Sequence, residues 1–202
     1  MDTLERWVRW IGAAGAAVTL GAVLVGLVQA QFRQRGRSTG QAARMLRVPV
    51  YLVLAVLYFG SIYLLWRPLP VLASNPLRIA ALVLGSLLLL PGLTLTLWAR
   101  LTLGRMYNVS SAVGAQLYAD HRLITHGPFS VIRHPMYAGI LAASLGGLLV
   151  YRTWSLVFTT ITLLGLSIRA RREEQALAAE FGEAWLEYSR RVPGWLPRLR
   201  RR

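Results

Sequence analysis

The stretch Thr125-His-Gly-Pro-Phe-Ser-Val-Ile-Arg-His-Pro-Met-Tyr-Ala-Gly139 places polar, turn-forming and aromatic residues directly before an apolar run. Proline fits the first turn of a helix, because its missing N–H would have no partner there, so Pro135 predicts a helix start. The residue before a proline avoids the helical region, which puts His134 at the helix mouth. Helix N-termini attract anionic and polar groups, so His134 and Tyr137 are candidates to line a cofactor pocket. The alternative is a turn that only enters a membrane span.

The composition is that of an integral membrane protein. Of 202 residues, 55% are hydrophobic and 15% are charged, and the mean hydropathy is +0.46. Soluble domains carry about 25% charged residues. Cysteine is absent, which excludes disulfides and thiolate chemistry, and the three histidines lack the HExxH spacing of zinc enzymes. We therefore expect no metal site.

All 23 basic residues are arginines, and the formal net charge is +15. A strongly basic chain can indicate nucleic-acid binding. Here the arginines lie in clusters beside apolar runs instead of forming one basic face, which favours membrane topology. We expect no nucleic-acid partner.

Five apolar runs predict five membrane spans in an all-α integral membrane protein. They cover about 7–28, 48–66, 77–99, 136–150 and 154–168. At roughly 1.5 Å per residue, the first run can cross a hydrocarbon core of roughly 30 Å. The last two runs are short and are joined by only Tyr151, Arg152 and Thr153, which predicts a tight helical hairpin.

The distribution of arginines predicts the orientation. Residues 29–47 contain five arginines, residues 100–134 contain four and the tail after Ile168 contains nine, whereas the two remaining loops have one each, Arg67 and Arg152. Cytoplasmic loops carry the excess of basic residues, so we expect the N-terminus outside and the C-terminal tail in the cytoplasm. The all-arginine, alanine-rich composition is typical of a high-GC prokaryote, which suggests a prokaryotic plasma membrane.

The tail contains most of the acidic residues and an amphipathic pattern. Leu177, Phe181, Trp185 and Tyr188 recur at helical spacing, which predicts one amphipathic helix over 169–190, packed on the loop 100–134 or on the membrane surface. Five of the eight acidic residues lie in this segment: Glu173, Glu174, Glu180, Glu183 and Glu187.

Glu173 and Glu174 differ from the other three because they lie nearest the fifth span, on the side of the His134 helix mouth. A carboxylate there could hold a ribose or an ammonium group. The alternative is local helical pairing with neighbouring arginines, worth only about 0.2–0.5 kcal/mol per pair.

Two separated motifs carry a family resemblance. His126–Gly139 is followed, after the hairpin, by Arg172-Glu-Glu174, Phe181-Gly182, Tyr188 and Arg191-Val-Pro193. This pattern resembles the isoprenylcysteine carboxyl methyltransferase family, together with the related phospholipid N-methyltransferases. The resemblance covers about 103–197, whereas the first three runs match only as generic membrane helices. It implies three N-terminal spans over 1–99, and a catalytic region over 100–202 that binds S-adenosylmethionine between the loop and the tail.

The resemblance also implies site residues. Leu123, Ile124, Gly127, Phe129, His134 and Tyr137 would line the cofactor site, and Glu173 and Glu174 would hold its polar end. Methyl transfer from a sulfonium is an in-line displacement, so the enzyme mainly aligns two reactants. A carboxylate acceptor is ionised at neutral pH and needs only an orienting arginine, for which Arg133, Arg169 and Arg191 are candidates. An amine acceptor would need a base, such as His126 or His134. We favour a carboxylate on a small or lipid-tailed acceptor.

Two other functions stay open. Sterol and steroid reductases share a similar Arg-His-Pro stretch but use NADPH, and they usually carry asparagine after His-Pro, where this chain has Met136. A non-catalytic membrane protein would use Arg-His-Pro and Glu-Glu only as interfacial anchors. The chain also departs from the family pattern, because Phe129 and Trp185 replace usual tyrosines and Gly194 replaces a common arginine.

Overall fold

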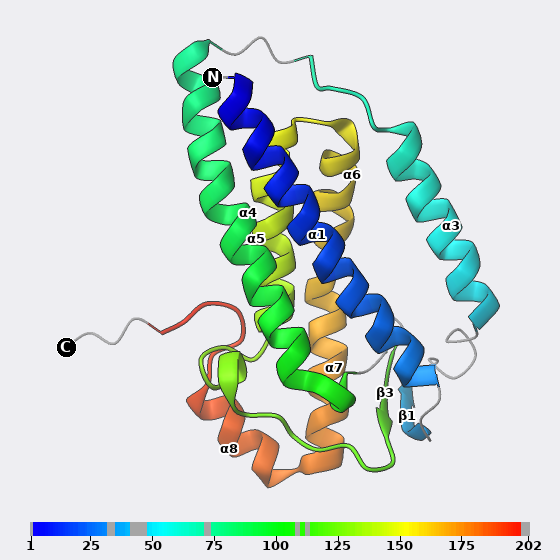
Figure 1. Ribbon diagram of the computed structural model, residues 1–202. Helices are drawn as coiled ribbons and strands as arrows, with labels where there is room; N and C mark the ends of the chain where they lie inside the picture. Colours follow the sequence, from blue (N-terminus) through cyan, green and yellow to red (C-terminus); the bar gives the residue numbers. More distant parts are fainter. Residues whose placement is uncertain are drawn as a thin grey trace.

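The computed structural model is mostly helical, with long helices packed side by side (Figure 1). It describes residues 2–31, 35–40, 48–70, 74–107, 110–111 and 114–198. The elements in chain order are α1 (Asp2–Gln31), β1 (Arg35–Gly40), α3 (Val48–Leu64), α4 (Asn75–Leu103), the 3-10 turn η1 (Gly104–Met106), β2 (Ser110–Ser111), β3 (Gly114–Tyr118), the 3-10 turn η2 (Gly127–Ser130), α5 (Pro135–Tyr151), α6 (Trp154–Leu163), α7 (Leu166–Phe181) and α8 (Glu183–Arg191).

Within the ranges that the structure describes, two helical segments are long and apolar enough to cross a membrane. They are Thr3–Gln29 and Asn75–Met106, and only 17% and 28% of their most apolar windows are buried inside the protein. A core helix of a soluble protein would be mostly buried. These helices instead present large apolar side chains such as Val18 and Leu87 outward, as lipid contact requires. Val53–Leu64 and Pro135–Tyr151 are shorter apolar helices, so the number of five spans stays a prediction.

Helices α4 and α5 approach so closely that their backbones nearly touch. A Cβ added at Gly146 would lie 2.3 Å from the backbone nitrogen of Leu89, and one at Gly92 would lie 2.5 Å from the backbone nitrogen of Ala143. Small residues at such interfaces let membrane helices pack closely. Leu82, Leu89, Ala143 and Val150 form the adjacent apolar core. This contact fixes α5, and with it the motif at the start of α5.

We expect Gly146→Ala to destabilise the protein clearly more than Gly21→Ala. The new methyl group at position 146 meets backbone atoms that cannot rotate away, whereas a Cβ at Gly21 has nothing within 4 Å. Overpacking of this kind costs about 1–3 kcal/mol. Both sites are helical, so the gain in helix propensity is matched. Thermal unfolding in detergent measures the difference, and equal melting temperatures for the two variants would contradict the packing.

Arg100, in the last turn of α4, holds the C-terminal end of that helix against α1. Its side chain is buried over Gly26, where an added Cβ would lie 2.1 Å from the guanidinium. Arg100 Nε donates to the carbonyl of Ala22 at 3.1 Å, and the guanidinium lies 4.5 Å from the ring centroid of Tyr107. This contact places α1 beside the segment that leads to the site.

A small antiparallel sheet with the order β1-β3-β2 departs from the all-helical expectation. Arg35 pairs with Tyr118, Gly40 pairs with Gly114, and β2 joins the other edge of β3. Leu117 on β3 packs against Ala176 on α7, so the sheet covers the helix that carries the two glutamates.

The predicted continuous helix over 169–190 is wrong. Helix α7 begins at Leu166, inside the predicted fifth run, and ends at Phe181, and α8 begins at Glu183. Gly182 separates them with a φ of +50°, a conformation that glycine adopts without steric cost and that ends the helix. The turn folds Trp185 and Tyr188 back onto Leu177 and Phe181, so all four expected apolar residues meet in one cluster.

Candidate active site

The motif before α5 is hydrogen-bonded directly to the segment of the tail that follows α8. Pro135 is the first residue of α5, which confirms the predicted helix start, and His134 has a non-helical backbone. The N–H of Arg133 donates to the carbonyl of Pro193 at 2.8 Å, and the N–H of His134 donates to the carbonyl of Gly194 at 3.0 Å. The tail therefore forms one wall of the region around the helix mouth.

Glu174 binds the two central residues of the motif. One carboxylate oxygen lies 2.8 Å from His134 Nε2 and 3.0 Å from Arg133 Nη2. The hydrogen bond from His134, with the nearby charges of His134 and Arg133, lowers the pKa of Glu174 below its ordinary value against the opposing effect of burial. An ionised carboxylate only accepts hydrogen bonds, so His134 donates from Nε2. Arg133 also donates to the carbonyl of Ser189 at 2.8 Å, which connects α7, the motif and α8.

Glu173 lies on a second branch of the same network. The hydroxyl of Tyr137 donates to Glu173 Oε1 at 2.5 Å, and Arg169 Nε lies 3.5 Å from the same oxygen. The Arg169 guanidinium also lies 5.4 Å from the centroid of the Tyr137 ring. Glu173 therefore makes both the local helical pair with an arginine and a contact to α5 through Tyr137.

Three aromatic rings lie together at the helix mouth. The rings of His134 and Tyr137 are stacked, with their centroids 5.8 Å apart and an interplanar angle of 7°. Trp195 adds a third ring, 5.5 Å from His134 and 6.3 Å from Tyr137. Trp195 was not predicted, because it follows α8 in irregular backbone, where no periodicity indicates the direction of a side chain.

Tyr188 fastens α8 to the motif. Its hydroxyl donates to the carbonyl of Phe129 at 2.7 Å, and the Phe129 side chain is buried. Burial raises the pKa of Tyr188 to about 12. The positive charge of the nearby Arg133 lowers this pKa, but its effect is smaller than that of burial. Tyr188 is therefore a neutral donor at physiological pH.

Two adjoining cavities meet at this network. The first, of about 120 Å³, lies among the loop after β3, α7 and α8, and the second, of about 250 Å³, lies among α1, α5, α6 and α7. The residues that line both are Leu103, Phe129, Arg133, His134 and Glu173. The second cavity is walled mainly by apolar side chains, including Val23, Ile140 and Leu163, with Arg169 and Tyr137 near the shared boundary.

Most of the expected site residues lie together. Leu123, Ile124, Phe129, His134 and Glu173 line the first cavity, as does the candidate Arg133, and Tyr137 and Arg169 line the second. Glu174 holds His134 and Arg133 from beside the cavity. Gly127 has a φ of +60° and turns the chain at η2 against Thr102. Arg191 is not among the lining residues of either cavity; its side chain is 70% exposed and pairs with Glu187 at 3.4 Å.

Sequence reasoning missed several lining residues of the first cavity, including Leu103, Met106, Leu117 and His121. Leu103 and Met106 end a membrane helix, and Leu117 lies on a strand that was not expected. This cavity is also lined by Leu177, Trp185 and Tyr188. The helical spacing of these apolar residues was the one sequence signal that could have indicated their place in the site.

The fold and this site define a helical membrane protein with an acidic and aromatic site where α5, α7 and the tail meet. Residues 83–179 match the sequence model of the isoprenylcysteine carboxyl methyltransferase (ICMT) family. The match confirms the family resemblance seen in the motifs. It runs from the middle of α4 through α5 and α6 to most of α7.

Individual relatives match over part of the chain. The chain is 37% identical over 111 residues to the cobalt-zinc-cadmium resistance protein CzcN of Cupriavidus metallidurans, an alignment that covers 49% of this chain and 50% of that protein. It is 35% identical over 123 residues to a protein-S-isoprenylcysteine O-methyltransferase of Xenopus laevis, covering 57% of this chain and 40% of that protein. The chain thus spans half or less of the length of these two relatives.

A solved structure of a eukaryotic intramembrane Ras methyltransferase, ICMT, is similar with a TM-score of 0.46 and 23% identity. The alignment covers 75% of this chain and 53% of that chain.

Proposed function

We propose that this protein is a membrane-embedded methyltransferase that uses S-adenosylmethionine, with residues 100–202 as its catalytic region. The methyl acceptor is a carboxylate on a small or lipid-tailed molecule. The observation that carries this proposal is the pair of cavities that share His134 and Glu173, one facing the loop and tail and one facing the apolar helices. The arginine-rich segments favour a cytoplasmic position for this end of the protein.

The residues of the first cavity fit the cofactor chemically. S-adenosylmethionine carries a cationic sulfonium, an amino acid end with an ammonium and a carboxylate group, ribose hydroxyls and a flat adenine. Glu173 lines the cavity and offers a carboxylate for the ammonium group or the hydroxyls, and Glu174 lies beside it on His134 and Arg133. Leu117, Leu123 and Trp185 offer apolar surface for the adenine ring. When bound, the cofactor supplies an electrophilic methyl group.

The size of the first cavity implies that binding widens it. Its volume of about 120 Å³ is below the roughly 300 Å³ at which ligand pockets usually begin. One wall consists of α8, held by the hydrogen bonds from Tyr188 to Phe129 and from Arg133 to Ser189. We expect this wall to move outward when the cofactor enters.

The second cavity fits an acceptor with an apolar tail. Val23, Met136, Ile140 and Leu163 give it apolar walls. Arg169 lies where this apolar region meets Glu173 and Tyr137, so it can orient a carboxylate toward the shared boundary. Arg133 also lines this cavity, and its guanidinium is anchored on the carbonyl of Ser189 and the carboxylate of Glu174.

The reaction then needs alignment more than proton transfer. An acceptor carboxylate is ionised at neutral pH, so its oxygen can attack the methyl carbon in line with the departing sulfur without a general base. Arg169 orients the attacking carboxylate, Glu174 holds His134 and Arg133 in place, and the rings of His134, Tyr137 and Trp195 exclude water. The names of relatives such as the protein-S-isoprenylcysteine O-methyltransferases support an acceptor of this kind.

The alkali stability of the bond that links the methyl group to the product tests the class of acceptor. With methyl-labelled cofactor and a membrane extract, we expect label in an apolar fraction that mild alkali releases as methanol, because methyl esters hydrolyse and N-methyl groups do not. The Glu187→Gln variant, changed at an exposed residue, should behave like the wild type. Label that survives alkali would contradict the carboxylate acceptor and favour an amine acceptor.

A further inference from the structure

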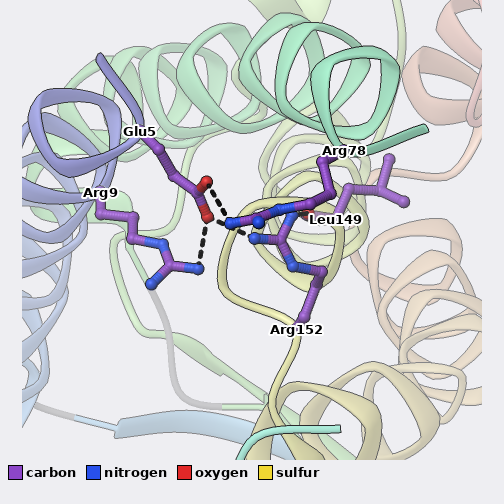
Figure 2. A network of polar contacts seen from close by, with 5 residues as sticks. All are labelled: Glu5, Arg9, Arg78, Leu149 and Arg152. Carbon is purple, nitrogen blue, oxygen red and sulfur yellow. Dashed lines mark hydrogen bonds and ion pairs between the residues drawn. The ribbon is translucent and has the colours of Figure 1, made fainter. Parts of the chain in front are cut away.

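At the end of α1, α4 and α5 that lies away from the candidate active site, arginines from three parts of the chain surround one carboxylate (Figure 2). Glu5 on α1 is 8% exposed. It pairs with Arg9 Nη2 at 2.7 Å, with Arg78 Nη2 of α4 at 3.3 Å, and with Arg152 from the turn between α5 and α6. This network ties three helices together.

Among the side chains that the structure describes, the positive charge in this cluster exceeds what Glu5 can neutralise. One carboxylate faces three arginines, and Arg6 lines the cavity beside them. The side chains of Glu5 and Arg152 are 10% and 20% exposed, whereas those of Arg9 and Arg78 are 40% and 38% exposed. Glu5 and Arg152 therefore form the floor, and Arg9 and Arg78 form a cationic rim.

A donor of the rim is also unsatisfied. Arg9 Nε is buried and has no hydrogen-bond partner in the part of the chain that the structure describes. A buried donor without a partner is unfavourable, so an added acceptor would be favourable here.

The cavity beside the rim has the size and lining of a ligand site. Its volume is about 440 Å³, within the roughly 300–1,000 Å³ of small-molecule pockets. Arg6, Arg9 and Arg78 supply the charge, and Trp10, Ala13 and Tyr151 supply an apolar and aromatic wall. The hydroxyl of Tyr151 donates to the carbonyl of Arg9 at 2.6 Å, which holds that wall against α1. The cavity thus fits a group with an anionic head and an apolar neighbour.

Its depth in the membrane identifies the source of such a group. Helix α5 spans 17 residues between the two sites, roughly 25 Å at 1.5 Å per residue, so this cavity lies near the opposite membrane face. Trp7, Trp10 and Trp66 are 64%, 69% and 59% exposed at this end. Exposed tryptophans gather at the level of the lipid headgroups. The arginine rim therefore lies where lipid phosphates lie.

We propose that this cavity binds the phosphate of an anionic phospholipid headgroup through Arg6, Arg9 and Arg78. Guanidinium groups match phosphate oxygens in geometry and charge. The bound headgroup offsets the excess positive charge and strengthens the junction of α1, α4 and the turn between α5 and α6. The site is separate from the proposed methyl transfer and stands without it.

Thermal unfolding of the detergent-purified full chain tests the proposal. We compare the wild type, an Arg6→Gln/Arg78→Gln double variant and an Arg67→Gln control. Arg67 is exposed at the same end, where its carbonyl accepts from the N–H of Trp154, but it is not among the residues that line the cavity. The additives are micellar phosphatidylglycerol, micellar phosphatidylcholine and inorganic phosphate.

Phosphatidylglycerol should raise the melting temperature of the wild type and the control by at least about 3 °C more than phosphatidylcholine does. The double variant should lose most of this shift. If the double variant does not fold, Arg6→Gln alone should lose part of it, because Arg6 is exposed and outside the Glu5 ion pairs. Equal shifts in all proteins would overturn the site. An equal effect of inorganic phosphate would overturn the lipid as its source.

Discussion

Replacing Glu174 with glutamine is expected to weaken the binding of S-adenosylhomocysteine about 10- to 100-fold, because each hydrogen bond to a charged group contributes about 1.5–3 kcal/mol. The carboxylate of Glu174 holds both His134 and Arg133, at 2.8 and 3.0 Å. Glutamine removes the charge that these donors pair with, so the ring of His134 and the first cavity lose their alignment. Calorimetric titration measures the change.

The matched control is Glu187→Gln, which removes a carboxylate that is 67% exposed and pairs with Arg191. We expect the affinity of this variant to equal that of the wild type. Unchanged affinity in Glu174→Gln, or equal losses in the two variants, would remove Glu174 from the cofactor site.

The lowered pKa of Glu174 gives this contribution a definite pH range. The folded state holds the pKa below the ordinary value of 4.5, so the ionised form stabilises the fold. The contribution is complete above that value and is lost as the pH falls through the lowered folded pKa. Glu174 should therefore add no pH dependence to cofactor binding between pH 6 and 8.

The second large effect is expected for Arg169→Gln, which should lower kcat/KM roughly 100-fold, the cost of a small misplacement of the reactants. Arg169 lines the apolar cavity and lies 3.5 Å from Glu173. Its proposed role is to orient the acceptor, so the affinity for S-adenosylhomocysteine should change less than about 3-fold. The corresponding change in binding free energy is well under the roughly 1.4 kcal/mol of a tenfold change.

Arg191→Gln serves as the control, because Arg191 is exposed and lines neither cavity. Arg169→Lys should restore little activity, since lysine lacks the planar fork that binds both carboxylate oxygens. Normal turnover of Arg169→Gln, combined with a large loss of cofactor affinity, would move Arg169 to the cofactor side.

The sequence was sufficient where a long apolar run or a proline determined the structure. Helix α5 begins at Pro135, and its ends lie within one residue of the predicted run. The sheet could not be predicted, because β1 and β3 are separated by more than 70 residues and neither strand alternates apolar and polar residues. The break at Gly182 was hidden because helical spacing of apolar residues continues across it.

The candidate site, like the fold, could be predicted from the sequence only in part. The motif residues around His134 and the pair Glu173 and Glu174 meet as expected, because both segments adjoin helices that pack at one end of the bundle. The differing positions of Arg169 and Arg191 could not be foreseen, since exposure depends on the turn between α7 and α8. Trp195 joins the site only through the tertiary contact of the tail with the motif.

The most direct measurement is a calorimetric titration of the detergent-purified wild-type protein with S-adenosylhomocysteine and, separately, with NADPH. The proposed methyltransferase binds the first ligand at one site per chain and does not bind the second. Binding of NADPH alone would contradict the proposal and assign the site to a reductase, and binding of neither would leave a membrane protein without this catalytic function.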